Sequence, residues 1–171
     1  MKKLNKAFLV LLAMLAIGFV ATSFVACSDD DDSPSTVAVY KDSEATTDEY
    51  EAITFYSDKT FVQHVYYKQV DSDSGFTLTV SLDVATGTYS GDPTKDGTVT
   101  CTVTKEVDES SMSEATLAAT MEALSAGKTS LSITNADVPL KAVTPYEITA
   151  TISGKNASVV IDDETETYVR Q

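Results

Sequence analysis

The chain has 171 residues and a formal net charge of -14, with 26 acidic and 12 basic residues. This length suggests one domain, and so acidic a chain lacks the cationic face that nucleic-acid binding requires. With one His and two Cys, it also lacks the four ligands of a usual zinc site, so we expect no metal and no cofactor.

Residues 1–26 have the plan of a secretory signal. Three lysines precede an unbroken apolar stretch from Ala7 to Ile17, and small and polar residues follow it. The twenty residues from Ala7 to Ala26 are also long enough to span a bilayer, so an uncleaved transmembrane anchor is the alternative. A Cys directly after Ala26 favours cleavage.

Phe24-Val25-Ala26-Cys27 resembles the lipobox of bacterial lipoproteins, with Phe24 where that pattern usually has Leu. The resemblance implies that residues 1–26 are removed and that Cys27 carries acyl chains, which together hold a protein stably on a membrane. Cleavage would remove three lysines and no acid, so the net charge would fall from -14 to -17.

Residues 27–35 form an acidic segment that includes four consecutive aspartates. Like charges repel, so we expect an extended, solvated tether; a calcium site is the alternative, but consecutive residues in a flexible run do not form a cation cage. An acidic run after a lipidated Cys also resembles the export signal of Bacteroidetes surface lipoproteins. That resemblance implies a place on the outer membrane, facing outward.

Residues 36–171 read as one β-rich domain, because Val and Thr are abundant and apolar residues alternate with polar ones. Such alternation is typical of antiparallel sheets with one buried face, and turn-forming residues separate the segments. Pro139 weakens the segment around it, since proline cannot donate a ladder hydrogen bond. The predicted strands are 36–40, 50–56, 60–69, 76–84, 87–90, 98–105, 129–134, 138–143, 146–153, 157–161 and 165–170.

One segment has a helical pattern instead. Ser111 and Glu114 have the spacing of a capping box, and Leu117, Met121 and Leu124 recur at i, i+4 and i+7. We expect a helix over 111–126 whose apolar stripe packs on the sheet. A lid over a ligand site is the alternative.

The strand series fits a closed antiparallel β-barrel in meander order, with a β-sandwich as the alternative. Closure is favoured because it leaves no exposed sheet edge.

Three segments resemble bacterial lipocalin-like lipoproteins. Residues 53–61 resemble their first hairpin, Gly87-Thr88-Tyr89 a mid-barrel strand, and residues 146–170 the closing strands. The resemblance implies a lipocalin-like barrel of about eight strands that holds a small hydrophobic or amphipathic molecule. The Gly-x-Trp signature of lipocalins is absent, so the alternative is a non-enzymatic surface or structural lipoprotein with a filled core, contacting carbohydrate or protein.

Few residues suggest chemistry. His64 is the only imidazole and shares a predicted face with Val62 and Tyr66. A catalytic triad would need a nucleophile and an acid beside it, so we expect a structural His and no enzymatic activity. Cys101 lies on an apolar face and is expected to be a buried, inert thiol.

Three tyrosines are candidate ligand contacts, because aromatic side chains can line a cavity or stack on a sugar. They are Tyr66, Tyr67 and Tyr89. Tyr66 and Tyr67 are adjacent in a predicted strand, so their side chains should face opposite ways.

Overall fold

The computed structural model describes residues 34–161 and 164–171. The predicted signal peptide, the lipidation site Cys27 and all but the last two residues of the predicted tether lie outside the described residues. The first strand begins at Thr36.

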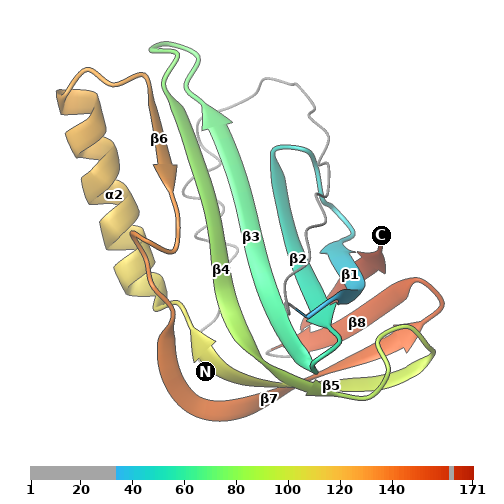
Figure 1. Ribbon diagram of the computed structural model, residues 1–171. Coiled ribbons are helices and arrows are strands. Elements are labelled where there is room, and N and C mark those ends of the chain that lie inside the picture. The colour runs from blue at the N-terminus through green and yellow to red at the C-terminus, as the bar shows by residue number, and fades with distance from the viewer. Residues whose placement is uncertain (1–33, 162–163) are drawn as a thin grey trace.

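The described residues form nine strands and one helix (Figure 1). In chain order these are β1 (Thr36–Asp42), β2 (Glu49–Tyr56), β3 (Thr60–Val70), β4 (Thr77–Ser90), β5 (Gly97–Glu106), α2 (Glu109–Ser125), β6 (Ser130–Ile133), β7 (Lys141–Ser153), β8 (Asn156–Ile161) and β9 (Glu164–Arg170).

Eight of these strands close into an antiparallel barrel. Each of β1 to β4 pairs with the next strand, β5 pairs with β7, β7 with β8 and β8 with β9, and the ring closes where β9 pairs with β1. The short β6 lies outside this ring and pairs in parallel with the first residues of β4. The predicted meander barrel with one helix is confirmed, and the sandwich alternative is wrong.

Two pairs of predicted strands are each one continuous strand. The segments predicted at 76–84 and 87–90 are the 14-residue β4. The 13-residue β7 begins at Lys141, so it contains only the second half of the segment predicted at 138–143, followed by all of 146–153. β7 tolerates Pro145 because the pairing with β5 shifts register between Val103 and Lys105. A proline at such an irregularity removes no ladder hydrogen bond.

The barrel interior is the first of two apolar cores. The inward faces of β5, β7, β8 and β9 contribute to it, and Tyr40, Val99 and Val103 are fully buried there. Ile152 is buried, while Tyr146 and Ile148 are partly buried against the same core. The alternation predicted for β7 therefore faces inward, as expected.

The second core lies where α2 and β6 flank the first half of β4 (Figure 1). Leu78, Val80 and Leu82 of β4 pack there with Ile133 of β6 and Met112 of α2. The predicted apolar face of this strand is confirmed.

A β-bulge at Val84 joins the two cores. Gln63 of β3 lies opposite Ala85, whereas the next residue, His64, lies opposite Asp83. Val84 is therefore the extra residue, and Val84 and Ala85 are both buried. The bulge allows one long strand to contribute to both cores although its alternation changes phase.

The predicted start of the helix is wrong. The helix begins at Glu109, and its N-cap is Asp108, whose carboxylate accepts a hydrogen bond from the Ser111 N–H at 2.8 Å. Asp is as good an N-cap as Ser, and Asp108 lies three residues before Ser111.

The predicted packing face of the helix is also wrong. Leu117, Met121 and Leu124 are 64%, 61% and 49% exposed, whereas Met112 and Ala123 are buried. Beyond Met112, the inward face has the small side chains of Ala115, Ala119 and Ala123, which let the helix backbone lie close to the sheet. The helix therefore presents an apolar stripe to solvent.

This orientation gives a stability prediction. Met121→Ala is expected to change the free energy of unfolding by less than about 0.5 kcal/mol, since exposed positions contribute little. Met112→Ala, the same substitution on the inward face, is expected to cost about 2 kcal/mol or more. Urea titration of both variants measures the difference, and equal losses would contradict the orientation.

Candidate functional site

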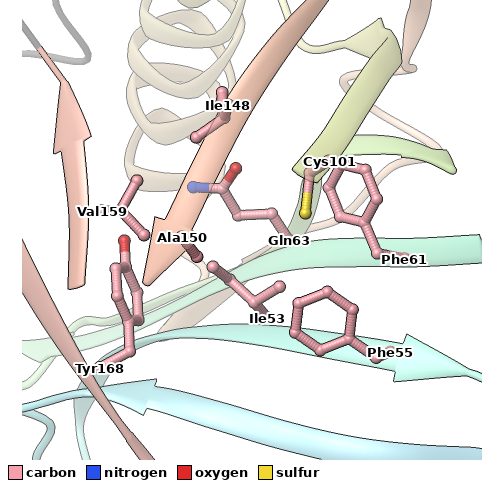
Figure 2. Close-up of a pocket in the computed structure, with 9 residues that line it drawn as sticks. All are labelled: Ile53, Phe55, Phe61, Gln63, Cys101, Ile148, Ala150, Val159 and Tyr168. Atoms are coloured by element: carbon pink, nitrogen blue, oxygen red, sulfur yellow. The ribbon is translucent and has the colours of Figure 1, made fainter. Parts of the chain in front are cut away.

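A small pocket lies in the interior of the barrel and is the candidate ligand site. Its volume is about 30 Å³, which holds roughly one or two water molecules. Ligand sites for drug-sized molecules begin near 300 Å³. The pocket is lined by Ile53, Phe55, Phe61, Gln63, Cys101, Ile148, Ala150, Val159 and Tyr168 (Figure 2).

Large side chains surround this pocket. Figure 2 shows the rings of Phe55 and Phe61 at one end of the pocket and Tyr168 at the other, with the Gln63 amide between them. Phe55 also packs edge-on against Tyr89, with ring centroids 4.9 Å apart. Beyond these rings, the Tyr40 hydroxyl donates a 2.6 Å hydrogen bond to the Pro93 carbonyl.

A carboxyl group lies at the polar end of the pocket. Glu51 of β2 accepts hydrogen bonds from Gln63 of β3, at 2.7 Å, and from the Tyr168 hydroxyl of β9. The same hydroxyl lies 3.0 Å from Glu166. Burial raises the pKa of Glu51, although the two hydrogen bonds act in the opposite direction.

The negative charge of Glu166 acts on the pKa of Glu51 in the same direction as burial. Tyr168 has one hydroxyl proton, which cannot serve two ionised carboxylates at once. Burial and the nearby Glu51 and Glu166 raise the pKa of Tyr168, so it keeps that proton. A second proton, on Glu51, would satisfy all three oxygens.

The candidate ligand tyrosines do not converge. Tyr66 faces outward and stacks on Tyr50 at 5.2 Å, whereas Tyr67 is partly buried against the second core. Tyr89 is buried in the barrel and donates to the Tyr56 carbonyl at 2.9 Å. Tyr66 and Tyr67 face opposite ways, as the alternation predicts; a role in ligand binding for any of the three stays a prediction.

Cys101 is buried, as expected. Burial raises the pKa of its thiol to about 12, so the reactive thiolate is scarce at neutral pH. This agrees with an inert thiol in the barrel wall.

His64 has two polar partners on the outer face that the sequence did not reveal. Its Nδ1 lies 2.8 Å from Asp83 Oδ1, and its Nε2 lies 3.2 Å from Ser81 Oγ. Ser81 and Asp83 are on β4, and Asp83 is the register partner of His64. The shared face of His64, Val62 and Tyr66 on β3 is as predicted.

An asparagine holds the backbone beside this cluster. The Asn135 side-chain carbonyl accepts from the Asp83 N–H at 2.8 Å, and its amide donates to the Asp83 carbonyl at 2.9 Å. Along β4, Asp83 lies between the residues that pair with β6 and those that pair with β5. Asn135 therefore makes the hydrogen bonds that a neighbouring strand would otherwise make. Only the pairing of β6 with β4, which the sequence pattern does not specify, brings it there.

Among the described residues there is no group of three or more His, Cys, Asp or Glu side chains that could hold a metal ion. The described helix is not long and apolar enough to cross a membrane. Comparison of the chain with protein families, curated proteins and solved structures gives no match.

Proposed function

We propose that this protein is a lipid-anchored component of a bacterial cell envelope that functions through its outer surface. The lipobox resemblance at Cys27 supports the anchor, and the acidic segment after it supports an outward-facing place on the outer membrane. The observation that carries the rest is the small pocket that the described residues leave in the barrel, with a volume of about 30 Å³.

The polar end of the barrel also disfavours an enclosed hydrophobic ligand. Such a ligand would displace Gln63 or Tyr168 from Glu51, because both residues line the pocket and both donate to that carboxyl group. A partly buried carboxyl group without its hydrogen bonds costs free energy. A protein or carbohydrate surface partner requires no such rearrangement.

A second candidate is the lipocalin-like function, in which the barrel holds a small hydrophobic or amphipathic molecule. The apolar lining of the pocket favours it, since seven of its nine residues are Ile, Phe, Cys, Ala or Val. It requires the side chains to move apart and open a larger cavity.

Native mass spectrometry of the full chain, released from detergent micelles, separates the two candidates. We expect only the mass of the lipidated polypeptide. A small molecule that stays bound through release, and is lost on unfolding, would overturn the filled barrel and favour the second candidate.

The anchor has its own test. Cys27→Ser is expected to move the protein from the membrane fraction to the soluble fraction, because the acyl chains hold the acidic domain on the membrane. Cys101→Ser is the matched control and should stay with the membrane, as should the parent chain. A Cys27→Ser protein that remains in the membrane would support the transmembrane alternative.

A further inference from the structure

We infer that Ser81, His64 and Asp83 form an acyl-transfer site on the outer face of β3 and β4, and that it cleaves small, exposed carboxylic esters. The inference goes beyond the proposed function and depends on neither the anchor nor the filled barrel. It also departs from the expectation that the chain has no enzymatic activity. That expectation arose because the sequence does not show which side chains converge on His64.

The hydrogen bonds have the order that activates a serine. A carboxylate can only accept, so the 2.8 Å contact with Asp83 places the imidazole proton on Nδ1. In the neutral ring, Nε2 is then the acceptor, and it faces the Ser81 hydroxyl at 3.2 Å. This is the arrangement in which His acts as general base for Ser and the acid fixes the tautomer.

Two features hold Asp83 in this position. The bulge at Val84 directly follows it, and bulges often redirect side chains beside active sites. Asn135 holds the Asp83 N–H and carbonyl from the other side. The carboxylate is thus carried by a backbone that is fixed at both edges of the strand.

An aromatic pair lies beside the imidazole. The centroids of the Tyr50 and His64 rings are 6.3 Å apart, and Tyr50 is itself stacked on Tyr66. The Lys41 ammonium lies 4.0 Å from the centre of the Tyr50 ring, on which it makes a cation–π contact. Tyr66 is the register partner of Ser81, so an aromatic side chain stands next to the nucleophile and offers an apolar contact for an acyl or aryl group.

The cluster is accessible to a substrate. The side chains of His64 and Asp83 are 28% and 43% exposed, and Ser81 is half-buried. These residues lie on a sheet face, so a small ester group that projects from a larger molecule fits better than a substrate that must be enclosed.

The reaction balances with water as the co-substrate. Ser81 Oγ attacks the ester carbonyl carbon while His64 Nε2 takes the hydroxyl proton; the alcohol leaves with that proton, and an acyl-serine remains. Water then attacks the acyl-serine, again losing a proton to Nε2, and the carboxylic acid departs as the proton returns to Oγ. General base assistance of this kind contributes about 10²–10⁴-fold.

The test uses the full chain in mild detergent with p-nitrophenyl acetate. We expect release of p-nitrophenol, with an acetyl adduct that maps to Ser81 by peptide mass spectrometry. Ser81→Ala should abolish the adduct and lower the rate by about 100-fold, and His64→Asn should lower it similarly. Ser132→Ala, which removes an exposed serine on β6, is the matched control and should leave the rate unchanged.

Circular dichroism establishes that each variant is folded before its rate is compared. Labelling by a fluorophosphonate, with and without Ser81, gives a second readout that does not depend on turnover. A folded Ser81→Ala protein with the parent rate, or adducts and labels only at other residues, would overturn the inference.

Discussion

Replacing Gly87 by alanine is expected to cost at least about 3 kcal/mol of folding free energy, more than an ordinary overpacked core substitution. A Cβ at this position would lie 1.9 Å from the Thr102 carbonyl oxygen and 3.1 Å from the Phe61 ring. The first contact is with the backbone of the neighbouring strand β5, which can move only if the β4–β5 pairing breaks. No side-chain rearrangement relieves it.

The reason lies in the local register. The pairing of β4 with β5 shifts between Thr86 and Gly87, and there the backbone of β5 lies where a side chain would otherwise project. Glycine is required for space at this site. The Gly87-Thr88-Tyr89 segment that resembles a mid-barrel strand is thus a place where two strands approach closely.

The control is Gly154, where glycine is needed for its backbone conformation and not for space. Gly154→Ala places a Cβ in open space but at a backbone φ of +62°, which should cost about 1–2 kcal/mol. Urea unfolding of both variants should therefore rank Gly87→Ala well below Gly154→Ala in stability. Similar losses would show that the β4–β5 contact relaxes, and would contradict the explanation.

The barrel could be predicted from the sequence because alternation is a local signal. Leu78, Val80 and Leu82 are inward because each follows the last by two residues, and that period is visible without knowing any partner strand. The bulge at Val84 is not visible in this way. Val84 and Ala85 are both apolar, so the sequence is equally consistent with the end of one strand and the start of another.

The orientation of the helix could not be predicted from its pattern. Leu117, Met121 and Leu124 form the most apolar stripe, but the sheet surface under the helix is already bulky, and alanines fit closer to it. Which face of the helix packs on the sheet depends on the shapes of both the helix surface and the sheet surface. A hydrophobic pattern on one helix describes only one of them.

Only part of the candidate acyl-transfer cluster could be predicted from the sequence. Ser81 and Asp83 alternate on the polar side of their strand, so a shared face was predictable. Whether they approach His64 depends on the register between β3 and β4, because a one-residue shift would turn their side chains to the opposite face of the sheet. The inward carboxyl of Glu51 was missed for a related reason: nothing in the sequence distinguishes it from the many exposed acids.

The interior carboxyl group gives the second large prediction. Glu51→Gln is expected to raise the free energy of unfolding at pH 8, with a gain in Tm on the order of 2–4 °C for each kcal/mol. Burial raises the pKa of Glu51 in the folded protein, so the folded state holds a proton that the unfolded state releases more easily. Glutamine is neutral at every pH and keeps a hydrogen-bonding side chain next to Tyr168 and Gln63.

The sign of the pH dependence follows from linkage. The stability associated with protonated Glu51 is fully present below the ordinary pKa of a glutamate, about 4.3, and is lost as the pH rises through the raised pKa of the folded state. The variant and the parent should therefore be closest in stability near pH 4, and the advantage of the variant should grow toward pH 8. Thermal melts at closely spaced pH values measure this difference.

Glu147→Gln provides the matched control, because it makes the same substitution on the exposed side of β7. It should change stability little at any pH, since substitutions at exposed positions away from structural features contribute little. Comparing each variant with the parent also removes the contribution of carboxylates such as Asp108, whose hydrogen bonds lower its pKa and whose stabilising effect is lost at low pH. A Glu51→Gln protein that loses stability at pH 8 would show that the ionised carboxylate, with its bonds to Tyr168 and Gln63, stabilises the barrel.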